Sequence, residues 1–340
     1  MRIPLLRLLR PLLASPESAP EVAGVVAQSA SRVVDLLERG ALHLLERSEI
    51  FRLNFPLPHP VQLAEGIAVR ALRLNGIAMW RTAERSPEQT ALLMSVLKKV
   101  LQTDHPVVVF DLDDTLFSTL FRHVAVLREY GRLHNVPLMT LIGPEHLTSW
   151  DLNKVLINNL GMEPVWVKTH MPAIRAFWNE RFFSDRYLAY DVPLAGAAKY
   201  VQQLRDAGAH IVYLSGRHEW EMKEGTLSAL SRHHFPMPDG DEVTLVLKPQ
   251  SFDYTKPGMS DVDRIEAQTR SDIDFKKWAV GLIQRLGKVV ACVDNEPGNI
   301  NMMRAAFFPE GGGYAIRPRT GAGKNVPLDP GVLLINGFLY

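Results

Sequence analysis

Three short stretches of the chain are almost wholly apolar, and each ends abruptly in polar residues. They read HPVVVF over 105–110, HIVYL over 210–214 and VVACV over 289–293. Apolar stretches of this length, without alternation, are typical of strands that are buried on both faces of a parallel sheet. The sequence VTLVLK over 243–248 predicts a fourth strand.

Helical patterns lie between these strands. GAAKYVQQLRDAG over 196–208 and FKKWAVGLIQRLG over 275–287 each precede a strand or loop and are closed by glycine. Helices that alternate with buried strands predict an α/β fold with a doubly wound, Rossmann-like parallel sheet. Right-handed crossovers then bring the carboxyl ends of the strands to one edge, where such sheets bind ligands.

The remaining segments define the expected domain boundaries. From Glu17 to about Leu101, apolar residues recur three and four positions apart, which predicts a helical accessory region. Between 118 and 191 the strand pattern is absent, and helical spacing rich in tryptophan and histidine predicts a cap inserted above the sheet edge. The expected parts are a helical N-terminal region (1–104), an α/β core (105–117 and 192–318), a helical cap (118–191) and a C-terminal tail (319–340).

The accessory region begins with leucines at helical spacing, in the sequence MRIPLLRLLRPLL. Arg7 and Arg10 interrupt the apolar stretch, which argues against a signal peptide. Two interpretations stay open: a short helix docked on the rest of the protein, which we favour, and a helix at a membrane surface. Further along, the dipeptide Ser86-Pro87 predicts the start of a helix over 87–101.

The composition excludes several classes of protein. The chain has 340 residues, of which 46% are hydrophobic and 22% are charged, as in ordinary globular proteins. A formal net charge of +1 provides no overall field to attract nucleic acid. No stretch approaches the roughly 18 apolar residues of a membrane helix. Cys292 is the only cysteine, which excludes a disulfide scaffold, and we expect a protein of a reducing, cytoplasmic compartment.

Polar side chains follow three of the predicted strands, at the edge where their carboxyl ends meet. The candidates are Asp111, Asp113, Asp114 and Thr115 after the first strand, Ser215, Gly216 and Arg217 after the second, and Asp294, Asn295, Glu296 and Asn299 after the third. Close carboxylates resist joint ionisation unless a cation lies with them. We expect that cation to be Mg²⁺, which binds a few carboxylates together with waters and a phosphate.

In this order the motifs resemble those of the haloacid dehalogenase superfamily of phosphohydrolases. The matching stretches are FDLDDTL at 110–116, YLSGR at 213–217, a lysine further along, and VDNEPGN at 293–299. The resemblance covers about 107–300, with the cap inserted between the first two motifs. It implies the haloacid dehalogenase type of α/β core and leaves 1–104 unmatched.

The resemblance also implies a role for each matching residue. Asp111 would be the nucleophile that forms an aspartyl-phosphate, and Asp113 would protonate the leaving oxygen and then take a proton from water. Ser215 would hydrogen-bond a phosphoryl oxygen, and Lys276 would offset the charge that develops on the transferred group. The implied ligands of Mg²⁺ are Asp111, the backbone carbonyl of Asp113, Asp294 and Asn299.

Other motif positions leave alternatives open. Thr115 would help to fix the first loop near the substrate. Gly216 and Arg217 are candidates for substrate contact, with an ion pair an equal alternative for Arg217. Asn299 replaces the second acidic residue of the commonest pattern, which lowers the charge at the metal and would weaken Mg²⁺ binding.

Three lysines compete for the role in phosphoryl transfer. Lys276 is favoured because the family lysine commonly begins the helix before the fourth motif. Its neighbour Lys277 and Lys248, at the end of the VTLVLK strand, are the alternatives.

We therefore expect a Mg²⁺-dependent phosphohydrolase that cleaves a phosphate monoester. The cap favours a small, soluble substrate over a folded phosphoprotein, and no basic stripe with aromatic residues indicates nucleic acid. A phosphotransferase or mutase would use the same residues, and a binding or regulatory protein could keep the fold without catalysis. The sequence leaves open which substrate is used and which oligomeric state is formed.

Overall fold

The computed structural model describes residues 86–147, 151–256, 258–320 and 326–340. The chain divides into two units, 1–80 and 81–340, and the described residues belong to the second. The expectations for 1–85, including the docked or membrane-surface helix, lie outside the described residues. Within the described ranges, no helix has both the length and the apolar character that crossing a membrane requires.

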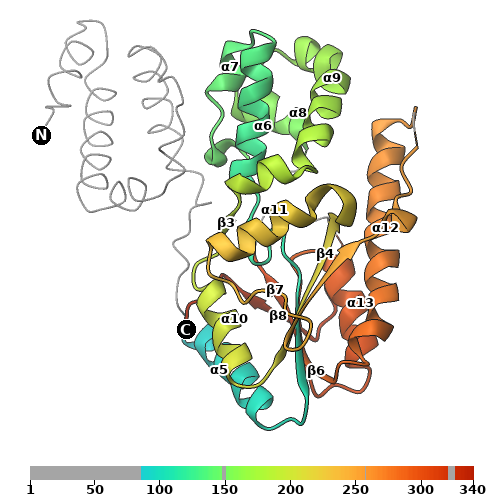
Figure 1. Ribbon diagram of the computed structural model, residues 1–340. Helices are drawn as coiled ribbons and strands as arrows, with labels where there is room; N and C mark the ends of the chain where they lie inside the picture. Colours follow the sequence, from blue (N-terminus) through green and yellow to red (C-terminus); the bar gives the residue numbers. More distant parts are fainter. Residues whose placement is uncertain (1–85, 148–150, 257, 321–325) are drawn as a thin grey trace, which may run out of the picture. The chain divides into compact units, whose positions relative to one another are not determined.

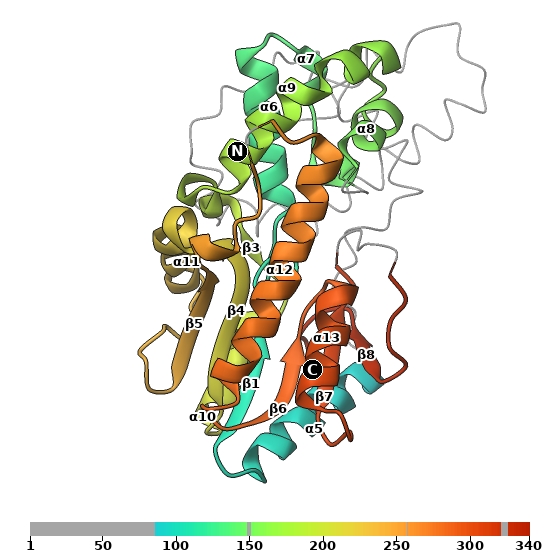
Figure 2. The same cartoon turned by 90° about the vertical axis from the view of Figure 1, so that its right-hand side faces the viewer.

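A parallel sheet of six strands forms the centre of the described unit (Figures 1 and 2). The strands are β1 (Pro106–Phe110), β4 (His210–His218), β5 (Val243–Lys248), β6 (Lys288–Val293), β7 (Tyr314–Pro318) and β8 (Val332–Ile335). Their order is β5-β4-β1-β6-β7-β8, and all neighbouring pairs are parallel. The four strands predicted from apolar stretches are confirmed, and with them the doubly wound α/β fold.

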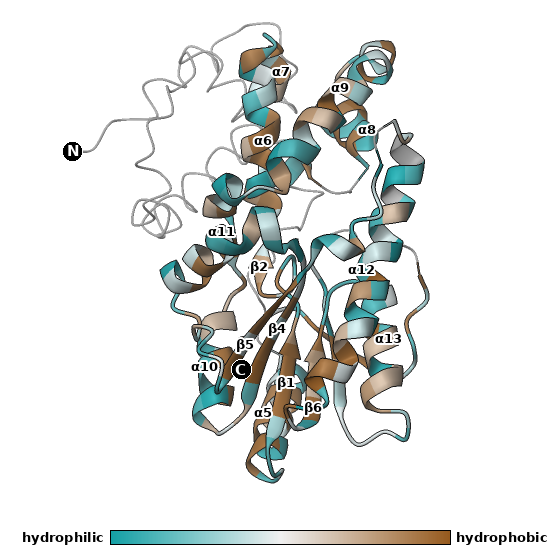
Figure 3. Cartoon of the chain, turned by 45° about the vertical axis from the view of Figure 1, so that its right-hand side comes forward, coloured by the Kyte–Doolittle hydropathy of each residue, from teal (hydrophilic) through white to brown (hydrophobic). Residues whose placement is uncertain are grey.

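Helices cover both faces of this sheet. They are α5 (Pro87–Leu101), α10 (Ala197–Asp206) and α11 (Glu219–Arg232) on one face, and α12 (Asp261–Ile283) and α13 (Pro297–Phe307) on the other. Alternate residues of β1 pack in two apolar clusters, Val108 and Phe110 in the first and Val107 and Val109 in the second. Because each face of β1 packs in a buried apolar cluster, every residue of this strand is apolar (Figure 3).

Two parts of the chain differ from the expected boundaries. Helix α5, which the sequence assigned to the accessory region, packs Leu93 and Val96 into the same apolar cluster as β1. Residues 319–340, expected as a tail, provide the edge strand β8 and the buried Phe338. The α/β core therefore takes in one segment before and one segment after the range that the motifs cover.

A helical insertion interrupts the core between two short strands. These strands, β2 (Phe117–Ser118) and β3 (Val192–Pro193), pair antiparallel at its base. The insertion contains α6 (Leu120–Leu133), α7 (Pro137–Thr140), η3 (Pro144–His146), α8 (Leu152–Lys154), η4 (Val155–Asn159), α9 (Pro164–Phe182) and η5 (Asp185–Tyr190). It has an apolar cluster of its own, and its helices lie beyond the carboxyl ends of β1 and β4 in Figures 1 and 2.

Candidate active site

Asp111 and Asp294 lie at the ends of two neighbouring strands. Asp111 follows β1 and Asp294 follows β6, and the two strands pair with Phe110 opposite Val293. From β1 the chain continues to β4 and β5 on one side, and then to β6, β7 and β8 on the other. The gap between β1 and β6 is thus a topological switch point, where open α/β sheets bind ligands.

Lys276 of α12 places one ammonium between these two carboxylates. Its Nζ lies 2.8 Å from Asp111 Oδ1 and 2.6 Å from Asp294 Oδ2. Burial raises the pKa of Asp111 to about 7, although Lys276 opposes that rise, and the charge of Asp294 adds to it. Burial also disfavours the charge of Lys276, but the two carboxylates outweigh it and hold the pKa of the lysine above its usual value.

The donors around this pair fit a hard divalent cation. One ammonium offsets two buried carboxylates, so the group keeps a net negative charge. Asn299, in the first turn of α13, is also buried at this edge. In the described ranges, no group of three or more His, Cys, Asp or Glu side chains is placed so that it could hold a metal ion by itself. A few oxygen donors suit Mg²⁺, which keeps several of its waters.

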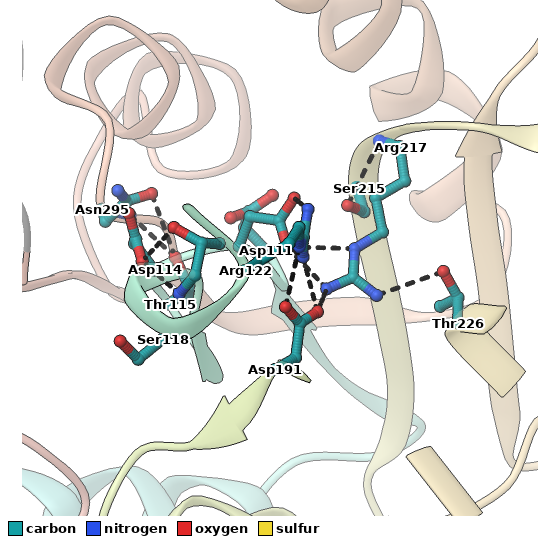
Figure 4. Close-up of polar contacts among 12 residues, drawn as sticks. Asp111, Asp114, Thr115, Ser118, Arg122, Asp191, Ser215, Arg217, Thr226 and Asn295 are labelled. Atoms are coloured by element: carbon teal, nitrogen blue, oxygen red, sulfur yellow. Dashed lines mark hydrogen bonds and ion pairs between the residues drawn. The ribbon is translucent and has the colours of Figure 1, made fainter. Parts of the chain in front are cut away.

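A second ionic cluster surrounds the carboxylate of Asp113. Its Oδ1 accepts hydrogen bonds from Arg217 Nε at 3.0 Å, Arg217 Nη2 at 2.5 Å and Arg122 Nη2 at 2.8 Å. Both guanidiniums also contact Asp191 Oδ2, at 2.5 Å from Arg122 Nη2 and 2.7 Å from Arg217 Nη2 (Figure 4). The side chains of Arg122, Arg217 and Asp191 are fully buried, whereas 30% of the Asp113 side chain is exposed.

The two arginines set the charge state of Asp113. Burial would raise the pKa of this carboxyl, but Arg122 and Arg217 hold it well below its usual range. Arg122 comes from α6 of the insertion and Asp191 from the residue before β3, so the insertion contributes two of the four members. Sequence reasoning missed both, because nothing in their local sequence distinguishes them from surface residues of a helical segment.

Strand β4 places the residues of the second motif at the same edge. Phe110 pairs with Tyr213, so the buried Ser215 lies two positions further toward the edge. A Cβ on Gly216 would lie 3.0 Å from Asp272 Oδ1, so glycine allows α12 to approach β4 closely. For Arg217, the structure shows the ion pair that the sequence left as one of two alternatives.

Thr115 joins the first loop to the third. Its Oγ1 accepts a hydrogen bond from the backbone N–H of Asn295 at 2.9 Å and lies 3.3 Å from Oδ1 of the Asn295 side chain (Figure 4). Thr115 is fully buried, so its hydroxyl connects two loops within the protein. Asp114 is bound within its own loop, where its carboxylate accepts from the amide and the hydroxyl of Thr119, both at 2.9 Å.

Comparisons with known proteins give neighbours in structure only. No protein-family model and no curated protein matches the sequence. The chain resembles a solved structure described as a phosphatase from Clostridium difficile, with 14% identity and a TM-score of 0.40 over 68% of this chain and 95% of that one. It also resembles a haloacid dehalogenase-like hydrolase from Bacteroides fragilis, with 17% identity and a TM-score of 0.36 over 68% of this chain and 97% of that one. A third structure is described as a β-phosphoglucomutase from Bacteroides vulgatus, with 17% identity and a TM-score of 0.33 over 73% of this chain and 93% of that one.

The second of these three descriptions is the one that names the superfamily whose motifs the sequence resembles. At such TM-scores the three structures carry no conclusion about activity. The support for a function comes from the arrangement of side chains in this chain.

The structure distinguishes among the three candidate lysines. Only Lys276 contacts Asp111, whereas Lys277 is exposed and Lys248 pairs with Asp272 Oδ1 at 2.7 Å. The prediction that Lys276 begins its helix is nevertheless wrong. Helix α12 begins at Asp261, so Lys276 lies in its interior and not at its start. Its position follows from the length of α12, which carries this residue along the sheet to the ends of β1 and β6.

Proposed function

We propose that the chain is a Mg²⁺-dependent phosphohydrolase that cleaves a phosphate monoester through an aspartyl-phosphate on Asp111. The observation that carries the proposal is the shared contact of Asp111 and Asp294 with Lys276, at the switch point of the sheet. Three separate segments bring a carboxylate, a second carboxylate and an ammonium together. Phosphoryl transfer needs such a set, because its catalysis rests on positioning and on offsetting charge.

In the first step an oxygen of Asp111 attacks phosphorus. A bond forms between this oxygen and phosphorus, and the bond from phosphorus to the ester oxygen breaks. Asp113 gives a proton to the leaving oxygen, so that an alcohol departs. The proton comes with the substrate, since a phosphate monoester has its second pKa near 6 and is partly monoanionic at neutral pH. Because Arg122 and Arg217 hold Asp113 in its carboxylate form, Asp113 does not carry this proton beforehand, and relays it from the phosphate to the leaving oxygen as the ester bond breaks.

In the second step water attacks phosphorus. Asp113 takes a proton from this water, the bond between phosphorus and Asp111 breaks, and inorganic phosphate leaves. Lys276 is held charged beside Asp111 and offsets the negative charge of the transferred group in both steps. Ser215, in the last part of β4, donates to a phosphoryl oxygen.

Asp111, the carbonyl of Asp113, Asp294 and Asn299 would hold Mg²⁺, and the ion would supply positive charge to the phosphoryl oxygens. The insertion favours a small, soluble substrate. It stands over the sheet edge in Figures 1 and 2, and its Arg122 reaches Asp113 of the core at 2.8 Å.

A simple assay tests the proposal. The purified chain is given p-nitrophenyl phosphate with MgCl₂, with EDTA, and as the Asp111→Asn variant. We expect turnover that requires Mg²⁺ and that the substitution abolishes. Absence of turnover by the unaltered protein over a broad panel of phosphate monoesters would contradict the proposal and favour a binding protein that keeps the fold.

A further inference from the structure

Asp191 belongs to no sequence motif, yet it is fully buried between two guanidiniums. Its Oδ1 accepts from Arg122 Nε at 2.8 Å, and its Oδ2 accepts from Arg122 Nη2 at 2.5 Å and Arg217 Nη2 at 2.7 Å. Its backbone oxygen lies 3.0 Å from Nε2 of His233, the residue after α11, and this contact anchors the segment to the core. Both carboxylate oxygens of Asp191 are thus committed to the arginines.

The same arginines bind Asp113 unequally at its two oxygens. Asp113 Oδ1 has three contacts, from Arg217 Nε, Arg217 Nη2 and Arg122 Nη2, at 2.5 to 3.0 Å. Asp113 Oδ2 has one contact in the described structure, from Arg122 Nη1 at 3.4 Å. One oxygen is therefore fixed in place, and the other is left with one long bond on a side chain that is 30% exposed.

We propose that Asp191 is a positioning residue that keeps Asp113 Oδ2 available for proton transfer. It does so by competing with Asp113 for the donors of Arg122 and Arg217. The proposal rests on the proposed function, since it concerns the residue that protonates the leaving oxygen. The side chain of Asp191 is fully buried and paired with Arg122 and Arg217, so in this proposal it acts only through the two arginines.

The charge balance of the cluster gives the reason. Two guanidiniums face two carboxylates, and each guanidinium carries five N–H donors. Buried charges are costly unless they are paired. When the carboxylate of Asp191 is replaced by an amide, both guanidiniums keep Asp113 as their only anionic partner in the cluster. Their donors then turn to Asp113 and occupy Oδ2 as well as Oδ1. Proton transfer from Asp113 Oδ2 to the ester oxygen in the first step is then blocked.

The test compares substrates that differ in their need for this proton. p-Nitrophenolate leaves without protonation, whereas an alkyl oxygen, as in glycerol 2-phosphate, requires it. The measured quantity is the ratio of kcat/KM for p-nitrophenyl phosphate to kcat/KM for glycerol 2-phosphate, because kcat/KM reports on the steps up to departure of the alcohol and not on the later hydrolysis of the phosphoenzyme. Because both values come from one preparation, the ratio does not depend on how much of a variant is correctly folded.

We expect Asp191→Asn to raise this ratio at least tenfold, with the KM values changed less than threefold. Asp113→Asn is expected to raise it further. The matched control is Asp185→Asn in the same segment. Asp185 accepts the Gly225 amide at 2.6 Å but contacts neither arginine, so this variant is expected to keep the ratio of the unaltered protein.

A double variant provides a rescue. Arg122→Met combined with Asp191→Asn leaves one guanidinium, Arg217, for one carboxylate, Asp113. Oδ2 then loses its contact with Arg122, and we expect the ratio to return to within about threefold of the unaltered protein.

The two hypotheses fail in different ways. If Asp113→Asn leaves the ratio unchanged, the proton-donating role in the proposed function is wrong. If Asp113→Asn raises the ratio but Asp191→Asn leaves it unchanged, or if the double variant gives no return, the role of Asp191 is overturned while the proposed function stands.

Discussion

Two ionic clusters lie next to each other in this protein, and they differ in charge balance. In the first, Asp111 and Asp294 share the single ammonium of Lys276. In the second, Asp113 and Asp191 share the two guanidiniums of Arg122 and Arg217. The first cluster has one positive charge fewer than it has negative charges, and the second is balanced.

The difference shows in the acidity of the two carboxylates of the first motif. The pKa of Asp111 is raised to about 7, whereas the pKa of Asp113 is held well below its usual range. Residues two positions apart in the sequence therefore meet opposite environments. This difference in charge balance fits the proposed function, in which the first cluster binds a further cation for phosphoryl transfer and the second, which needs none, serves proton transfer.

The largest expected effect is at Asp111, the proposed nucleophile in the first cluster. Asp111→Asn removes the attacking oxygen, and we expect kcat to fall by roughly 10⁴-fold or more. Asp113→Asn removes an acid–base group and is expected to cost roughly 10²-fold or more. Steady-state kinetics with p-nitrophenyl phosphate measures both, with Asp185→Asn as the control. Equal losses in the two variants would argue against distinct roles for the two clusters.

A second prediction concerns the ammonium of the first cluster. Lys276→Met leaves two buried carboxylates without a cation, so we expect kcat to fall by roughly 10²–10³-fold and the free energy of unfolding to fall by about 3–5 kcal/mol. Because Mg²⁺ can replace the missing charge, added MgCl₂ should recover part of the lost thermal stability. Lys277→Met, the exposed neighbour, is the matched control and should change stability by less than about 0.5 kcal/mol.

A third prediction concerns the balanced cluster. Asp191→Asn leaves two buried guanidiniums with one carboxylate, so the free energy of unfolding should fall by about 3 kcal/mol. Here MgCl₂ should recover none of that loss, since the deficit is one of negative charge. Thermal unfolding with and without MgCl₂ checks this. Recovery by Mg²⁺ equal to that of Lys276→Met would mean that the two clusters respond as one.

The smallest expected effect is at the link between the loops of the first cluster. Thr115→Val keeps the shape of the side chain but removes the acceptor for the buried Asn295 amide. We expect a loss of about 1–2 kcal/mol in the free energy of unfolding and little change in kcat. Chemical denaturation measures the first, and a loss below about 0.5 kcal/mol would show that this bond does not hold the loops together.

Much of the fold could be predicted from the sequence because both faces of its central strands are buried. Val107, Val108, Val109 and Phe110 leave no polar position, and the abrupt change at Asp111 marks the sheet edge. Helix α5 was also predicted, but its place in the core was not. The apolar positions of α5 indicate that one face of the helix is buried, but they do not indicate which part of the protein covers that face.

The candidate site was predictable only in part, for a similar reason. Asp111 and Asp294 each follow an apolar strand, and Ser215 follows the apolar part of β4, which continues to His218, so their meeting at one edge follows from the parallel sheet. Arg122 and Asp191 come from the insertion, and their partners are fixed by the way α6 and β3 meet the core. Such contacts between segments far apart in the chain leave no spacing that a sequence could show.

The central claim is that Asp111 becomes phosphorylated during turnover. The most direct measurement is acid quenching of the protein during steady-state hydrolysis of a phosphorus-labelled monoester, followed by peptide mapping by mass spectrometry. The account predicts a phosphoryl group on the peptide that contains Asp111, removed by hydroxylamine and absent from Asp111→Asn. Turnover that persists in Asp111→Asn, with no label on this peptide in the unaltered protein, would contradict it.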